Sequence, residues 1–195
     1  MNRNARLTLS FLVIPLLATP ALAHTGAGTG GLMSGFMHPI GGLDHVVAMV
    51  AVGLWGGILG KPAIWQLPIV FPVVMALAGA MGVMGVPIPG VEVGIALSGI
   101  VLGLAVLFLV KPPLALAAAI VGIFAVFHGH AHGTELPDAA NPLAYAVGFV
   151  VATGLLHLAG IAFGLLMARP AGVVAVRAAG GVIAVAGAAF LTGYA

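Results

Sequence analysis

The sequence predicts an all-α membrane protein, a bundle of six transmembrane helices that follows a cleavable signal peptide. The first of three supporting observations is composition, because 62% of the 195 residues are hydrophobic and only 5% are charged. A soluble domain carries roughly 25% charged residues, since its surface faces water. The mean hydropathy of +1.26 points the same way. Lipid is therefore expected to surround most of this chain.

The second observation is the regular spacing of apolar stretches. Short breaks rich in proline and glycine separate six of them. Each stretch is close to the ~20 residues that a helix needs to cross a bilayer. The predicted spans are residues 41–59, 63–83, 91–110, 114–132, 142–168 and 173–194.

The third observation concerns residues 1–23, which have the features of a signal peptide. Two arginines precede a short apolar run, and a small-x-small cleavage site ends at Ala23. Cleavage there would make His24 the mature N-terminus and leave residues 24–195 as one transmembrane permease domain. The alternative is that this segment stays in place as an uncleaved first helix.

Loop charge predicts the orientation in the membrane. Every basic residue after the signal peptide lies in or beside the loops that follow the first, third and fifth spans: Lys61, Lys111, Arg169 and Arg177. Cytoplasmic loops carry such residues. We therefore expect a multi-pass protein of the bacterial inner membrane with both mature termini on the periplasmic side.

Several classes of function are disfavoured by the same composition. The absence of cysteine excludes disulfides and thiolate metal sites. A net charge of +2, with its basic residues at span ends, disfavours a nucleic-acid partner. The sequence has no phosphate-binding GxxxxGK[ST] loop and no nucleophile motif, so neither an ATP-driven pump nor an enzyme is expected.

The first group of polar residues enters span one from outside and contains His38, Asp44 and His45. Ionisable side chains in lipid are costly, so each is a candidate for function. On a straight helix His38 and His45 would lie about 10.5 Å apart along the axis, too far for one ion. Pro39 is expected to start the helix, and the Gly-Gly pair after it to let the backbone bend His38 toward the other two. Alternatively, Asp44 and His45 only pair with each other and cap the helix.

The second group leaves span four on the same side. His128 and His132 are four residues apart and share a helix face, about 6 Å from each other. Glu135 extends that face into the loop. His130 points roughly the opposite way and is either a ligand or a support for one. The alternative for the whole group is a solvated, pH-sensitive loop.

Four further residues are candidates at a lower rank. Glu92 opens the third span and either completes the site or sits at the interface. His157 lies deep in the fifth span, as a station on a pathway or as a buried histidine bonded to a neighbouring helix. Phe71 either bounds a pathway or packs in the core, and His24 could capture metal with its free amine.

The two groups together supply imidazole and carboxylate ligands without sulfur. This set suits nickel, cobalt, zinc or copper(II), whereas magnesium and calcium prefer oxygen alone. The metal is expected as a transported or bound substrate, Ni2+ or else Co2+ or Zn2+, and not as a permanently bound cofactor. The ligands do not separate these metals, and the sequence leaves the oligomeric state open, a homo-oligomer included.

At these residues the sequence resembles the hydrogenase/urease accessory nickel permeases, the HupE/UreJ family. The His-Pro-x-x-Gly-x-Asp-His pattern of its first span is matched from His38 to His45, and the Phe-His-Gly-x-Ala-His-Gly-x-Glu pattern from Phe127 to Glu135. The resemblance implies metal permeation into the cytoplasm for nickel enzymes, or cobalt in some relatives. It also implies roles for Glu92 and Phe71.

Other functions remain alternatives to a permease. A membrane accessory or sensor protein would bind the metal without transporting it. A haem protein would use intramembrane histidines as axial ligands, and this requires paired histidines deep in facing helices. A metalloenzyme would use a zinc-bound water.

Overall fold

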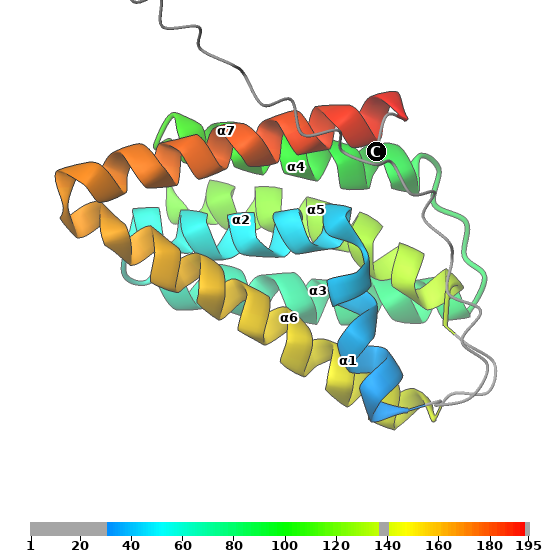
Figure 1. Cartoon of the computed structure of the whole chain (residues 1–195). Helices are drawn as coiled ribbons and strands as arrows, with labels where there is room; N and C mark the ends of the chain where they lie inside the picture. Colours follow the sequence, from blue (N-terminus) through cyan, green and yellow to red (C-terminus); the bar gives the residue numbers. More distant parts are fainter. Residues whose placement is uncertain (1–30, 137–140, 194–195) are drawn as a thin grey trace, which may run out of the picture.

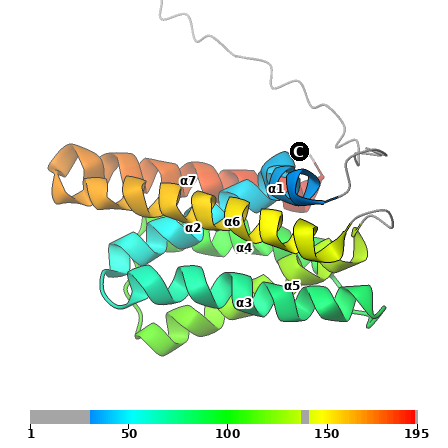
Figure 2. The same ribbon diagram turned by 90° about the horizontal axis from the view of Figure 1, so that it is seen from below.

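The computed structural model describes residues 31–136 and 141–193. Within these ranges helices are the only regular secondary structure, and Figures 1 and 2 show them gathered into one bundle. The helices are α1 (Leu32–Gly41), α2 (Leu43–Leu59), α3 (Ala63–Val83), α4 (Val91–Leu107), α5 (Leu114–Thr134), α6 (Pro142–Gly164), the short 3-10 helix η1 (Leu165–Ala168) and α7 (Pro170–Thr192). The predicted signal peptide and His24 lie outside the described residues.

The lengths and hydropathies of these helices agree with a multi-pass membrane protein. Among the described residues, four helical stretches are long and apolar enough to cross a bilayer: α3, α5, α6 together with η1, and α7. The bent pair formed by α1 and α2 makes a fifth candidate. The predicted third span, residues 91–110, is shorter than expected, because α4 ends at Leu107 after 17 residues. The all-α class is thus confirmed, and the part of the chain that the structure describes holds four or five candidate spans.

Helix α1 was not predicted, and its presence means that the residues before α2 form a separate helix. Pro39 lies inside α1 instead of starting a helix, and α1 ends two residues after it. Proline removes one hydrogen bond of a helix and disfavours its continuation. Gly42 then adopts an extended conformation, with φ −97° and ψ 111°. The axes of α1 and α2 differ in direction by 85°, so the expected bend is present at Gly42.

Four close helix pairs build the bundle: α3 with α5, α4 with α7, α6 with α2, and α6 with α1. Small residues let the backbones approach. A Cβ atom at Gly103 would lie 2.5 Å from the amide nitrogen of Ala184 on α7. A Cβ atom at Gly160 would overlap the carbonyl oxygen of Val50 on α2. Such contacts are the usual basis of helix association in lipid, where apolar side chains gain nothing by leaving the solvent.

The connections between helices lie at two opposite ends of the bundle. In Figure 1 the connections α2–α3, α4–α5 and α6–α7 are at one end, and the connection α3–α4, the end of α5 and the start of α6 are at the other, beside α1. Lys61, Lys111 and Arg169 belong to the first end. Glu135, which directly follows α5, belongs to the second. Basic and acidic groups are therefore separated along the bundle.

Candidate metal centre

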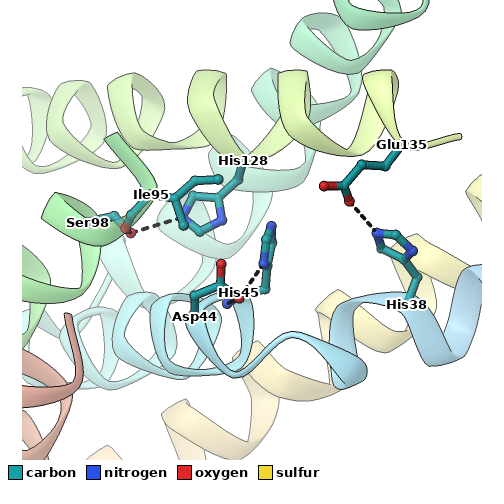
Figure 3. A network of polar contacts seen from close by, with 7 residues as sticks. All are labelled: His38, Asp44, His45, Ile95, Ser98, His128 and Glu135. Carbon is teal, nitrogen blue, oxygen red and sulfur yellow. Dashed lines mark hydrogen bonds and ion pairs between the residues drawn. The ribbon is translucent and has the colours of Figure 1, made fainter. Parts of the chain in front are cut away.

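The bend at Gly42 brings three possible ligands together at the acidic end of the bundle. One ligand atom each from His38, His132 and Glu135 lie within 4.8 Å of one another. Nε2 of His38 is 3.4 Å from Oε2 of Glu135 (Figure 3). The rings of His38 and His132 meet edge to face, with centroids 4.7 Å apart. We call these three residues the outer group.

The position of His38 depends on how α1 packs against α6. A Cβ atom at Gly35 of α1 would overlap the carbonyl oxygen of Tyr145 on α6, so only glycine permits this approach. The ring of Phe149, one turn further along α6, lies 4.4 Å from that of His132. It also lies 6.3 Å from that of His38. Helix α6 thus supplies an aromatic wall behind both imidazoles.

Glu135 carries a negative charge in this setting. Its carboxyl group lies just beyond the end of α5, with 56% of the side chain exposed. The hydrogen bond from His38 lowers its pKa from the ordinary value of 4.5, and this outweighs the opposing effect of burial. An ionised carboxylate next to two imidazoles is a suitable partner for a divalent cation.

Asp44 and His45 form a second pair at the start of α2. The Asp44 carboxylate oxygen Oδ1 accepts hydrogen bonds from the His45 amide, at 2.9 Å, and from its ring nitrogen Nδ1, at 2.8 Å. Nδ1 must donate, because a carboxylate only accepts. The other ring nitrogen, Nε2, is buried without a hydrogen-bond partner among the described residues. Carboxylates orient metal-binding histidines in this way.

The histidine rings form a continuous row that leads into the bundle. His45 lies 4.3 Å from His132, the inner member of the outer group. It also lies 4.8 Å from His128, centroid to centroid, one turn earlier on α5. Exposure falls along this path, from 7% at His132 to 0% at His128. The pairing of Asp44 with His45, which the sequence offered as an alternative to a metal site, is present, and His45 in addition contacts both histidines of the second group.

Beyond His128 the row continues through an aromatic ring. The Phe71 ring of α3 is 5.5 Å from the His128 ring and 5.6 Å from that of His157 on α6. Phe71 is fully buried, and His157 is 1% exposed. Neither ring nitrogen of His157 has a hydrogen-bond partner among the described residues. Among the described residues, His157 therefore makes no side-chain hydrogen bond to a neighbouring helix, which was the alternative.

Two predicted candidates lie apart from the row. His130 is 2.7 Å from the carbonyl oxygen of Val86, to which its Nε2 must donate, so it holds the connection between α3 and α4. Glu92 is exposed on the first turn of α4. In the part of the chain that the structure describes, no hydrogen bond or ion pair joins Glu92 to the histidines.

The sequence prediction missed Ser98, which contacts the row from α4. Its Oγ atom lies 2.9 Å from Nε2 of His128 and 2.6 Å from the carbonyl oxygen of Ile95 (Figure 3). Ser98 is completely buried. The sequence did contain a signal for this role: a hydroxyl group in the middle of an apolar stretch, where a polar group in lipid needs a hydrogen-bond partner.

The prediction also missed the glycines within the second histidine motif. A Cβ atom at Gly129 would overlap the carbonyl oxygen of Met75, and one at Gly133 that of Gly79. Both contacts are with the backbone of α3. The spacing of four residues is a small-xxx-small pattern that the sequence displays. These glycines let α5 lie directly on α3 and so set the position of its histidines.

Comparison with known proteins places this arrangement in a family. The family model described as HupE / UreJ protein matches residues 12–190. Protein HupE of Rhizobium leguminosarum bv. viciae is 48% identical over 186 residues, which cover 95% of this chain and 96% of the relative. No solved structure matches the chain. Since both matches extend over nearly the whole sequence, the chain belongs to the HupE/UreJ family.

Proposed function

We propose that this protein is a permease that imports Ni2+, or Co2+, across the inner membrane toward the cytoplasm, where it supplies metalloenzymes. The observation that carries the proposal is the outer group. His38, His132 and Glu135 offer ligand atoms within 4.8 Å of one another at one end of a membrane bundle. Two imidazoles and one carboxylate suit a divalent transition metal such as nickel, cobalt or zinc.

The row of histidines is the proposed route inward from this mouth. The outer group would strip part of the hydration shell and hold the ion. Asp44, His45 and His128 would receive it next, since their side chains follow in ring-to-ring contact. Phe71 would separate this segment from His157, the last station. Several weak sites in series permit conduction, because each must release the ion that it binds.

The proposed topology has six spans and a periplasmic mouth. Helix α4, the third span along the chain, would cross as well and complete the six, although 17 residues extend only about 26 Å. Residues 1–23 would be removed as a signal peptide. The end that holds Lys61, Lys111 and Arg169 would face the cytoplasm, in keeping with the positive-inside rule. Glu92 would then attract cations at the outer surface.

The choice of nickel before cobalt comes from the family and not from the ligands. Nitrogen and oxygen donors bind zinc and cobalt as well, so geometry and supply must set selectivity.

No enzymatic role is proposed. The membrane potential is worth ~2.3 kcal/mol per charge per 100 mV, so a divalent cation gains about twice that on entering a negative interior. This drive would suffice without ATP.

The test is metal flux into liposomes that contain the purified protein. We expect saturable nickel entry and competition by cobalt, and the effect of zinc would measure the selectivity of the site. His132→Ala and Asp44→Ala should each abolish entry. His130→Gln is the matched control, because this histidine bonds to Val86 outside the row. Saturable binding without flux would identify an accessory or sensor protein, and unchanged flux in both variants would refute the proposed site.

A further inference from the structure

His128 is the most enclosed histidine of the row, and its hydrogen bonding determines which ring nitrogen can bind metal. The side chain has no exposed surface. Its Nε2 atom is 2.9 Å from Ser98 Oγ. Its Nδ1 atom is buried without a hydrogen-bond partner among the described residues. A neutral imidazole carries one hydrogen, so one nitrogen is a donor and the other a lone pair.

The second contact of Ser98 decides where that hydrogen sits. Ser98 Oγ is 2.6 Å from the carbonyl oxygen of Ile95, one turn earlier on α4. A carbonyl oxygen only accepts, so the single hydroxyl hydrogen of Ser98 is committed to it. Ser98 Oγ can then only accept a hydrogen bond from His128. Nε2 of His128 must therefore carry the hydrogen, and Nδ1 must present the lone pair.

We infer that Ser98 is a positioning residue that holds His128 as the Nε2–H tautomer and so makes Nδ1 its metal-binding nitrogen. The inference rests on the proposed permeation of a divalent metal along the histidine row. Ser98 touches no metal in this role and acts only through His128.

The neighbouring histidine, His45, is held as the opposite tautomer, with its hydrogen on Nδ1. The Asp44 carboxylate binds Nδ1–H of His45 and leaves Nε2 available. The rings of His45 and His128 are 4.8 Å apart and nearly perpendicular. A carboxylate partner raises the basicity of a histidine ligand, whereas a neutral hydroxyl does so less. An ion that moves inward thus passes from His45, the more basic ligand, to His128, the less basic one. This order favours its onward release.

The first test reads the tautomer directly in the metal-free protein. The 15N resonances of protonated and bare ring nitrogens are well separated, so protein with 15N-labelled histidine reports both atoms of His128. We expect Nε2–H in the wild type and in Ser98→Thr, which keeps the hydroxyl. We expect a mixture of tautomers in Ser98→Ala. A wild-type spectrum with Nδ1–H would overturn the inference without any variant, and so would a Ser98→Ala spectrum like that of the wild type.

The second test measures nickel binding and flux in the same variants. Loss of a group that orients a metal ligand lowers affinity or activity about 10–100-fold. We expect a loss of this size in Ser98→Ala and recovery in Ser98→Thr. Thr153→Val is the matched control, since it removes another fully buried hydroxyl, one that has no hydrogen-bond partner among the described residues. Equal losses in Ser98→Ala and Thr153→Val would assign Ser98 a packing role only.

The two proposals fail in different ways. If metal permeation is wrong, nickel flux is absent in the wild type, while the tautomer of His128 still responds to Ser98. If the positioning role is wrong, flux is present, and Ser98→Ala leaves both the tautomer and the affinity unchanged.

Discussion

Nε2 of His38 lies 3.4 Å from Oε2 of Glu135, although one residue belongs to α1 and the other follows the end of α5. The contact joins the two motifs that the sequence displays separately. It exists because the axis of α1 is turned 85° from that of α2, which places His38 over the end of α5. If both residues hold the same ion, their contributions to metal affinity must be coupled.

A double-mutant cycle on this pair tests that coupling. We expect His38→Ala and Glu135→Gln each to lower nickel affinity about 10-fold or more. The double variant should lose little beyond the worse single variant, because the shared site is already broken. Titration calorimetry in detergent measures all four proteins, with Thr134→Val as a neighbouring control. Losses that simply add would mean that the two residues serve different sites.

The charge state of Glu135 gives a prediction on pH. Its pKa is lowered below the ordinary value of 4.5 by the hydrogen bond from His38, so the carboxylate is ionised throughout the range above that value. Its contribution to metal binding is therefore constant from about pH 8 to pH 6 and is lost only as the pH falls below the lowered pKa. Metal binding by imidazole ligands depends on pH in its own right, because the ligating ring must be unprotonated.

The measurement is nickel affinity of wild type and Glu135→Gln between pH 8 and pH 6. Both should weaken on acidification, and the ratio of the two affinities should stay constant. Curves that converge within this interval would show that Glu135 itself takes up a proton there.

The Asp44–His45 pair leaves no room for a side chain at one glycine of the pair that precedes α2. A Cβ atom at Gly42 would lie 2.8 Å from Asp44 Oδ1 and 3.0 Å from His45 Nδ1, whereas one at Gly41 would meet no atom within 4 Å. We expect Gly42→Ala to displace the Asp44–His45 pair and to lower nickel affinity about 10-fold or more. Gly41→Ala is the matched control and should bind as the wild type does. Equal affinity in the two variants would contradict a role of Gly42 in placing the Asp44–His45 pair.

Local features of the sequence predicted part of this structure well. The boundaries of α3, residues 63–83, follow from an apolar run between two proline-glycine breaks. The shared helix face of His128 and His132 follows from their spacing of four residues. Both depend only on residues near each other in the chain.

Contacts between distant segments were harder to predict. Helix α1 contains glycine, serine and proline, which weaken any helical signal, and its packing on α6 stabilises it. The direction of the bend at Gly42 depends on that packing as well. Ser98 acquires its partner only when α4 meets α5. No periodicity within one segment encodes such contacts.

His157 provides a prediction that separates binding from transport. It is buried at the far end of the row, beyond the ring of Phe71. His157→Leu fills similar space, so we expect the outer affinity for nickel to stay unchanged while flux into liposomes falls about 10-fold. Leu158→Val, at an exposed neighbouring position, is the control. Wild-type flux in His157→Leu would leave this histidine with a packing role.

The contact between α3 and α5 gives a prediction on stability as well as on binding. A Cβ atom at Gly129 would overlap the carbonyl oxygen of Met75, and backbone cannot move aside as a flexible side chain can. Overpacking of this kind costs about 1–3 kcal/mol. At Gly122 on the same helix, a Cβ atom would only touch Val70 and Val74 side chains at 3.9 Å. Alanine is the better helix former by about 1 kcal/mol, so this control should be neutral or stabilising.

Thermal unfolding of the purified protein, followed by nickel titration, checks this pair of variants. Gly129→Ala should lower the unfolding temperature, and Gly122→Ala should not. Because Gly129 directly follows His128, separation of α3 and α5 should also move that imidazole away from Ser98 and weaken nickel binding. If Gly129→Ala matched Gly122→Ala in both measurements, the close approach of the two helices would not be what positions the inner histidine.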